Sequence, residues 1–300
     1  MSKNFIDFDD HSLEVLQGII DRAISLKEEH KSGHINDSLK NKTLAMIFDK
    51  SSTRTRVSFE AGMTQLGGQS LFLSDKDIQL GRGEPITDSA IVISSMVDAV
   101  MLRLTSHEDI IEFSKHSRKP VINALSDESH PCQILADLMT YQEVRGSIKG
   151  KKIAWIGDGC NVCQTYMQAA EIFDFKLSIS TPRGFEPTKS FVEKYQKNIV
   201  FSDNPVEASR DADIIVTDVW TSMGQESEKN KRELAFKGFQ VDQKIMSTAR
   251  VDAIFMHCLP AYRGKEVSSE VIDGNQSFVW DEAENRLHVQ KALLLYLIEG

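Results

Sequence analysis

The chain carries at positions 48–60 the segment Phe48-Asp-Lys-Ser-Ser-Thr-Arg-Thr-Arg-Val-Ser-Phe-Glu60, between an apolar run at 43–48 and a helical pattern at 57–66. A buried strand that runs into a helix start leaves backbone N–H groups without partners inside the helix, and the helix dipole favours an anion there. The hydroxyl groups and cations around this helix start are Ser52, Thr53, Thr55, Lys50, Arg54 and Arg56. The segment predicts a phosphate-binding site, although a Ser/Thr helix cap beside an exposed basic turn has the same residues.

Short apolar runs typical of buried strands alternate with helical patterns along most of the chain. We expect strands at 43–48, 70–73, 99–104, 120–125, 152–156, 175–180, 198–201, 213–217 and 253–257. We expect helices at 13–24, 57–66, 89–97, 131–145, 162–173 and 284–298. This alternation predicts βαβ units and therefore parallel sheets. A turn at 146–150 separates two such patterns, so we expect an α/β protein of two domains with the active site between them.

Composition excludes several classes of protein. The chain of 300 residues is 41% hydrophobic and 26% charged, which is typical of a globular protein. A net charge of −9 argues against general binding to nucleic acid or to anionic membranes. The polar N-terminus predicts no signal peptide, and the longest apolar stretch, 90–102, is too short to span a bilayer. We expect a cytoplasmic protein whose four cysteines are reduced.

Polar side chains follow two further strands of the first half. Arg103 lies near the carboxyl end of its strand, where ligands gather in open parallel sheets, although a surface arginine is equally common there. His130 precedes a proline that suits a helix start, and Gln133 lies one turn further on. These two side chains can face one ligand, while a helix-capping histidine is the structural alternative.

The turn Gly157-Asp-Gly-Cys-Asn161 follows a strand and opens a helix, as a dinucleotide-binding turn would. However, Val162 stands at the third glycine position, and no acid ends the next strand, so the pattern does not favour NAD. Cys160 and Cys163 form a single C-x-x-C pair, which lacks the second pair of a zinc site and only weakly indicates redox chemistry. Asn161 is well placed to contact a ligand.

Two more strands of the second half end in polar loops. Asp218 begins the segment Asp218-Val-Trp-Thr-Ser-Met-Gly224, whose carboxylate, hydroxyl and glycine can bind an ammonium and a carboxylate together, although an ordinary turn is the alternative. Cys258 ends another strand beside Pro260; a lone cysteine is more often a small buried residue. The charged run 226–233 resembles a solvated face, and Arg286 opens the last helix, from which it can return to the anion site.

Together these segments resemble the aspartate/ornithine carbamoyltransferase family over nearly the whole chain. The motifs are Ser52-Thr-Arg-Thr-Arg56, Arg103, His130-Pro-Cys-Gln133, Asp218-x-x-x-Ser-Met-Gly224 and His257-Cys-Leu-Pro260; the last two resemble the ornithine enzymes specifically. One departure is Cys160, where many ornithine enzymes carry a second asparagine. The resemblance implies a carbamoyl-phosphate-binding domain at 1–146, an ornithine-binding domain at 147–284, interdomain helices, and a C-terminal helix at 285–300 that returns to the first domain.

The resemblance also implies roles for these residues. Carbamoyl phosphate would contact Ser52, Thr53, Arg54, Thr55, Arg103, His130, Gln133, the Leu259 carbonyl, Arg286, and Gln79 from a neighbouring subunit of a homotrimer. Ornithine would contact Asn161, Asp218, Ser222, Met223 and Cys258, and the catalytic groups would be Arg103, His130 and Cys258. The implied reaction gives citrulline and phosphate within arginine metabolism, without a metal or other cofactor. A carbamoyltransferase for another amine, such as putrescine, and a non-catalytic phosphate-binding protein are the alternatives.

Overall fold

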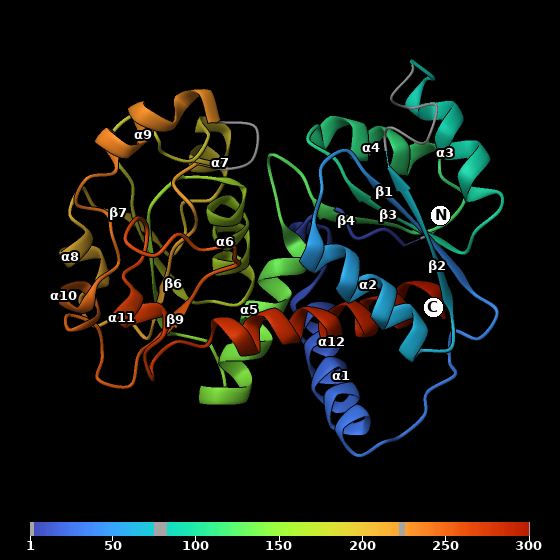
Figure 1. Ribbon diagram of the computed structural model, residues 1–300, viewed down its shortest axis with the longest axis horizontal. Coiled ribbons are helices and arrows are strands. Elements are labelled where there is room, and N and C mark those ends of the chain that lie inside the picture. Colours follow the sequence, from blue (N-terminus) through green and yellow to red (C-terminus); the bar gives the residue numbers. More distant parts are fainter. Residues whose placement is uncertain (1–2, 75–82, 222–225, 300) are drawn as a thin grey trace. The chain divides into compact units, whose positions relative to one another are not determined.

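The computed structural model describes residues 3–74, 83–221 and 226–299. The chain divides into two compact units: Met1–Met139 with Glu284–Gly300, and Thr140–Ala283. Helix α5 (Pro131–Arg145) carries the chain from the first unit into the second, and helix α12 (Val279–Ile298) carries it back (Figure 1). No helix within the described ranges is long and apolar enough to cross a membrane.

The first unit contains a four-stranded parallel sheet in the order β2-β1-β3-β4 (Figure 1). Its strands are β1 (Thr43–Phe48), β2 (Gln69–Ser74), β3 (Ala99–Arg103) and β4 (Val121–Leu125). Its other elements are η1 (Phe8–Asp10), α1 (Leu13–Lys31), α2 (Thr53–Gln65), α3 (Ile86–Ser94) and α4 (His107–His116). Alternate residues of a strand face opposite sides of the sheet. Ala45 and Ile47 accordingly pack with α3 and α4 residues such as Ala90 and Phe113.

The second unit contains a five-stranded parallel sheet in the order β7-β6-β5-β8-β9. Its strands are β5 (Lys152–Ile156), β6 (Lys176–Ser180), β7 (Ile199–Phe201), β8 (Ile214–Val216) and β9 (Ile254–Met256). Its helices are α6 (Asn161–Ile172), α7 (Lys189–Lys194), α8 (Pro205–Ser209), η3 (Glu226–Glu228), α9 (Lys229–Ala235), α10 (Gln243–Met246) and α11 (Ser269–Ile272). Ala154 and Ile156 of β5 pack with α10 and α11, while Trp155 contacts Tyr166 of α6 at a ring distance of 5.9 Å.

The strand orders decide where a ligand can bind in each sheet. From β1 the chain moves outward to β2 and then crosses to β3 on the other side, and from β5 it moves outward to β6 and later crosses to β8. Such a reversal opens a crevice at the carboxyl ends of the two central strands. The predicted α/β fold of two parallel sheets is therefore confirmed, and each sheet has one topological switch point.

Candidate active site

In the first unit, the predicted phosphate-binding residues lie at the carboxyl ends of β1 and β3. Phe48, the last residue of β1, is in register with Arg103, the last residue of β3. Helix α2 begins at Thr53, earlier than the helical pattern from 57 predicted, so the hydroxyl-rich and basic residues form its first turn. Ser52 is its N-cap and accepts the Thr55 N–H at 3.4 Å. The positive end of the helix dipole is thus at the switch point of the sheet.

Two buried arginines converge on one hydroxyl group of this helix. Arg103 Nη1 and Arg286 Nη2 donate to Thr55 Oγ1 at 3.2 Å and 2.9 Å. Arg286 Nη1 also donates to Gln133 Oε1 at 3.1 Å. Both guanidinium groups are less than one-tenth exposed. Because buried charge is costly, two cations held beside a helix N-terminus indicate a binding site for an anion.

His130 follows β4 and stands directly before Pro131, the first residue of α5. It is buried, and its pKa lies well below 6.5 because burial disfavours the cation and because Arg286, Arg103 and Arg54 repel it. The imidazole is therefore neutral at pH 7, and a neutral ring can donate one hydrogen bond to a ligand.

The two arginines of the Ser-Thr-Arg-Thr-Arg motif have different surroundings. Arg54 is half-buried, and its charge acts on His130. Arg56 is exposed, pairs with Glu60 at 2.9 Å and lies 3.8 Å above the ring of Phe72. Arg56 therefore packs on the exposed surface of α2, against Glu60 and Phe72. Thr53 is exposed in the first turn, and Gln79 lies outside the described residues.

Asp137 is a member of this group that the sequence did not single out. It is buried and accepts a hydrogen bond from Gln133 Nε2 at 2.8 Å. The only signal in the sequence is its spacing of four residues from Gln133, which places both on one face of α5.

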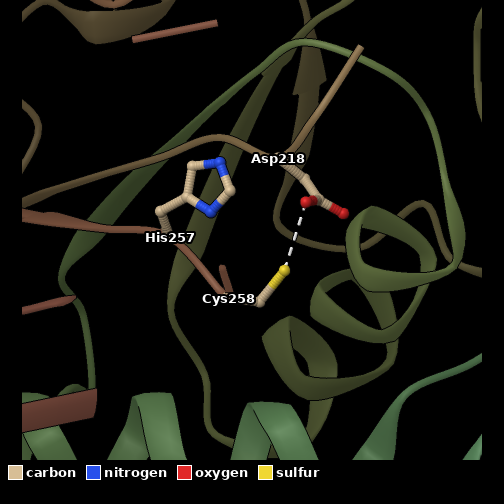
Figure 2. Close-up of side chains that lie close together, drawn as sticks. All are labelled: Asp218, His257 and Cys258. Atoms are coloured by element: carbon tan, nitrogen blue, oxygen red, sulfur yellow. Dashed lines mark hydrogen bonds between the residues drawn. The ribbon is translucent and has the colours of Figure 1, made fainter. Parts of the chain in front are cut away.

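In the second unit, Asn161, Asp218 and Cys258 follow the adjacent strands β5, β8 and β9. Cys258 Sγ donates to Asp218 Oδ1 at 3.2 Å (Figure 2). Cys160 Sγ is 3.7 Å from the other carboxylate oxygen, so two thiols contact the same acid. Asn161 starts α6, and its Oδ1 accepts the Val162 N–H at 2.9 Å. Ser222 and Met223 lie outside the described residues.

The thiols of this unit are protonated donors rather than thiolates. The pKa of Cys258 is raised well above 9.0, first by burial and then by the negative charge of Asp218. The same two causes raise the pKa of Cys160, and burial raises that of the fully buried Cys163. A reactive cysteine needs a lowered pKa, so the arrangement disfavours redox chemistry at the C-x-x-C pair.

His257 fixes the backbone that carries Cys258 and Leu259. Its Nδ1 accepts the Leu259 N–H at 2.9 Å, and its Nε2 lies 3.4 Å from the buried carboxylate of Glu266. Leu259 has a left-handed φ of 58°, which this hydrogen bond helps to hold. Ligand atoms of Asp218, His257 and Cys258 lie within 4.8 Å of one another, as in a metal site (Figure 2). Because both ring nitrogens face groups of this chain, the geometry favours a hydrogen-bonded network over metal ligation.

The Gly157-Asp-Gly turn packs closely against two other segments of this unit, at Pro187 and at Arg232. A Cβ atom on Gly159 would lie 2.2 Å from the nitrogen of Pro187, so only glycine fits. Asp158 pairs with Arg232 at 2.8 Å, and Arg232 also donates to the Trp220 carbonyl at 2.9 Å. The expectation of a solvated face over 226–233 is therefore wrong for Arg232, which is buried because it ties this turn to the segment after Asp218.

Comparison with known proteins agrees with this arrangement. Residues 3–143 match the model of the aspartate/ornithine carbamoyltransferase carbamoyl-P binding domain, and residues 149–297 match that of the Asp/Orn binding domain. An ornithine carbamoyltransferase of Ruthia magnifica subsp. Calyptogena magnifica is 64% identical over 99% of this chain and 100% of its own length. That of Hydrogenovibrio crunogenus is 57% identical over 99% of this chain and 98% of its own.

Solved structures show the same similarity. The ornithine carbamoyltransferase of Burkholderia thailandensis E264 has a TM-score of 0.93 and 50% identity, and the match covers 99% of each chain. That of Pyrococcus furiosus has a TM-score of 0.96 and 45% identity over 100% of this chain and 98% of its own. With both domain models matched in order and a full-length relative 64% identical, the chain belongs to the aspartate/ornithine carbamoyltransferase family.

Proposed function

We propose that this protein transfers the carbamoyl group of carbamoyl phosphate to the δ-amino group of L-ornithine, giving L-citrulline and phosphate. The observation that carries the proposal is the convergence of Arg103 and Arg286 on Thr55 at the start of α2. The choice of acceptor is supported by the names of the full-length relatives, which are ornithine carbamoyltransferases. In this proposal residues 1–146 bind carbamoyl phosphate, residues 147–284 bind ornithine, and 285–300 form a returning helix.

The phosphate group of carbamoyl phosphate would bind at the start of α2. Its contacts would come from Ser52, Thr53, Arg54, Thr55, Arg103 and Arg286. Backbone N–H groups of a first helical turn donate to phosphate oxygens, and arginine matches the geometry of phosphate. Support comes from the buried guanidinium groups of Arg103 and Arg286, which a bound dianion would neutralise.

The carbonyl group of carbamoyl phosphate would be polarised by Arg103, Thr55 and His130. Negative charge grows on the carbonyl oxygen as the amine attacks, and fixed donors stabilise that charge in the transition state. A neutral His130, as its lowered pKa provides, can donate to this oxygen without carrying a charge of its own. The Gln133 side chain and the Leu259 carbonyl would accept the N–H groups of the carbamoyl amine.

The substrate amino acid would be held at the carboxyl ends of β5, β8 and β9. Asn161 and the backbone N–H of Met223 would bind its carboxylate, while Asp218 and Ser222 would bind its α-amino group. Cys258 would orient the δ-amine. The contact between Cys258 and Asp218 supports this assignment because it couples the residue near the amine to the acid that binds the α-amino group.

The δ-amine must lose a proton, since alkyl amines have a pKa of about 10.4 in water. The attacking nitrogen forms a bond to the carbamoyl carbon, and the tetrahedral intermediate then collapses as the bond to the phosphate oxygen breaks. The raised pKa of Cys258 disfavours a thiolate base, so the thiol orients the amine by donating to Asp218. The first ammonium proton passes to solvent before the attack, and the second proton, carried by the attacking nitrogen in the tetrahedral intermediate, passes to the leaving phosphate.

We further propose a cytoplasmic homotrimer that works in arginine metabolism, with Gln79 of one copy reaching the site of its neighbour. Support comes from exposed apolar side chains on the first unit, which association would cover. They are Val57, Leu71, Ile91, Val92 and Met96.

The direct experiment supplies carbamoyl phosphate labelled in its carbonyl carbon together with L-ornithine. The proposal predicts labelled citrulline and an equal amount of phosphate. Arg103→Ala should lower kcat/KM by about a hundredfold or more, as the loss of a donor to the developing oxyanion does in other enzymes. Arg56→Ala is the matched control and should change it little, because Arg56 is exposed and bound to Glu60 and Phe72. Equal effects of the two variants would contradict the proposal.

A further inference from the structure

Gln133 lies between two charged side chains that together allow one orientation of its amide group. Its Nε2 donates to Asp137 Oδ1 at 2.8 Å, and its Oε1 accepts from Arg286 Nη1 at 3.1 Å. A carboxylate accepts hydrogen bonds and a guanidinium donates them. The amide nitrogen is therefore held toward Asp137 and the amide oxygen toward Arg286.

The surroundings make this orientation rigid. Gln133 and Asp137 are one turn apart on α5, and both side chains are almost completely buried. A hydrogen bond to a buried carboxylate is stronger than one in water because the local dielectric constant is low. If the amide were reversed, its nitrogen would face the donors of Arg286 and its oxygen would face the carboxylate, which are two repulsive contacts.

We infer that Asp137 is a positioning residue that makes the site selective for a carbamoyl group. This inference rests on the proposed function. An amide oxygen has two lone pairs, so Gln133 Oε1 can accept an N–H from the carbamoyl amine in addition to that of Arg286. A methyl group in the place of that amine, as in acetyl phosphate, has no such donor. Asp137 holds the nitrogen end of the amide and so keeps the oxygen directed at the carbamoyl amine.

Two stable ligands differ only in the group that would contact Gln133 Oε1, so comparing them measures this contact alone. Phosphonoacetamide has an amide NH2 where acetonylphosphonate has a methyl group, and the two share the phosphonate and the carbonyl. Isothermal titration of the full chain should show that the unaltered protein prefers phosphonoacetamide by about tenfold, the value of one hydrogen bond of about 1.4 kcal/mol. In Asp137→Leu this preference should fall to about twofold or less, because phosphonoacetamide binds more weakly while acetonylphosphonate and inorganic phosphate bind unchanged.

Two further variants show that the effect passes through Gln133. Asp137→Asn keeps an acceptor oxygen and should retain most of the preference. Gln133→Leu should abolish the preference, and adding Asp137→Leu to it should cause no further loss, which is the signature of coupled residues. If Asp137→Leu does not fold, Asp137→Ser replaces it, since a serine is too short to reach the Gln133 amide.

Equal weakening of both phosphonates in Asp137→Leu or Asp137→Ser would overturn the inference, because a merely structural role affects both ligands alike. Full retention of the preference in these variants would also overturn it. By contrast, failure of the unaltered protein to bind phosphonoacetamide would count against the proposed function itself. The two failures are therefore distinguishable.

Discussion

At the scale of single residues, burial sets the protonation states of key side chains in each unit. His130 is kept neutral and Cys258 is kept as a thiol, and in each case burial is the largest cause of the pKa shift. Neighbouring charges act in the same direction, cations on the histidine and Asp218 on the thiol. Both groups consequently act as neutral hydrogen-bond donors at pH 7.

The lowered pKa of His130 predicts a dependence of stability on pH. Because the unfolded chain binds this proton more readily than the folded one, the stability that neutral His130 contributes is present above pH 6.5 and decreases below it. The free energy of unfolding should therefore fall more steeply between pH 6.5 and 5 in the unaltered protein than in His130→Gln, by up to about 1.4 kcal/mol per pH unit. Urea unfolding at several pH values measures this, and parallel curves would contradict it.

The distances of the thiols from Asp218 predict different effects of replacing the cysteines. Cys258→Ser should lower citrulline formation more than the double variant Cys160→Ser/Cys163→Ser, because the Cys258 thiol is 3.2 Å from Asp218 whereas that of Cys160 is 3.7 Å away. Initial rates with and without a thiol reductant measure the effects. A larger loss in the double variant, together with dependence on the reductant, would indicate redox chemistry instead.

Residue types and spacing singled out Arg103 and His130, two side chains with a strong chemical signal that the structure brings together in the first unit. They did not predict Asp137 or Arg232, because an aspartate in an amphipathic helix and an arginine in a charged run have the same pattern as solvent-facing residues. The turn spacing of α5 places Asp137 beside Gln133, whereas only the fold brings Arg232 to Asp158.

At the scale of elements, local signals explain which boundaries were predictable. Helix α2 starts at Thr53 because Ser52 caps it, which the hydroxyl-rich sequence permits but does not require. Helix α12 starts at Val279, five residues before the predicted 284, in a segment without helical periodicity. Helix α4 was not predicted, although Ser106 caps it and acidic residues fill its first turn. Ile110 and Phe113 of α4 pack against the sheet, and this tertiary contact is not encoded in the local pattern.

The caps of α2 and α4 form a matched pair for a test. Ser52 accepts the Thr55 N–H, and Ser106 accepts the Asp109 N–H in the same geometry. Replacing either serine by alanine should cost about 1 kcal/mol of stability. Only Ser52→Ala should also raise the KM for carbamoyl phosphate, since Ser52 lies in the proposed phosphate site. Urea midpoints and steady-state kinetics check this, and an equal rise in KM for Ser106→Ala would contradict the assignment.

At the scale of the whole molecule, the sequence predicted two parallel sheets because strands and helices alternate throughout. It did not predict the strand orders β2-β1-β3-β4 and β7-β6-β5-β8-β9, since short apolar runs do not specify their neighbours. Those orders bring Thr55 beside Arg103 in one unit and Asp218 beside Cys258 in the other.

The proposed homotrimer predicts a solution mass of three times 33.7 kDa. Helix α3 begins at Ile86, shortly after Gln79, and Met96 just beyond it is 76% exposed. Met96 is one of the exposed apolar residues that we propose lie in the interface between subunits. A charge there should weaken association, so Met96→Asp should shift the solution mass toward that of the monomer. Ile35→Asp, at a position 81% exposed in a loop, should leave it unchanged. Sedimentation equilibrium measures both, and a monomeric unaltered protein would contradict the proposal.

The choice of acceptor amine is the central claim, and competition between ornithine and putrescine tests it. Putrescine has the reacting amine of ornithine but lacks the α-carboxylate that Asn161 and Met223 would bind. Loss of charge-assisted hydrogen bonds of about 1.5–3 kcal/mol each should lower kcat/KM for putrescine by about a hundredfold or more. We therefore predict a higher kcat/KM with ornithine than with putrescine. An equal or higher kcat/KM with putrescine would contradict it.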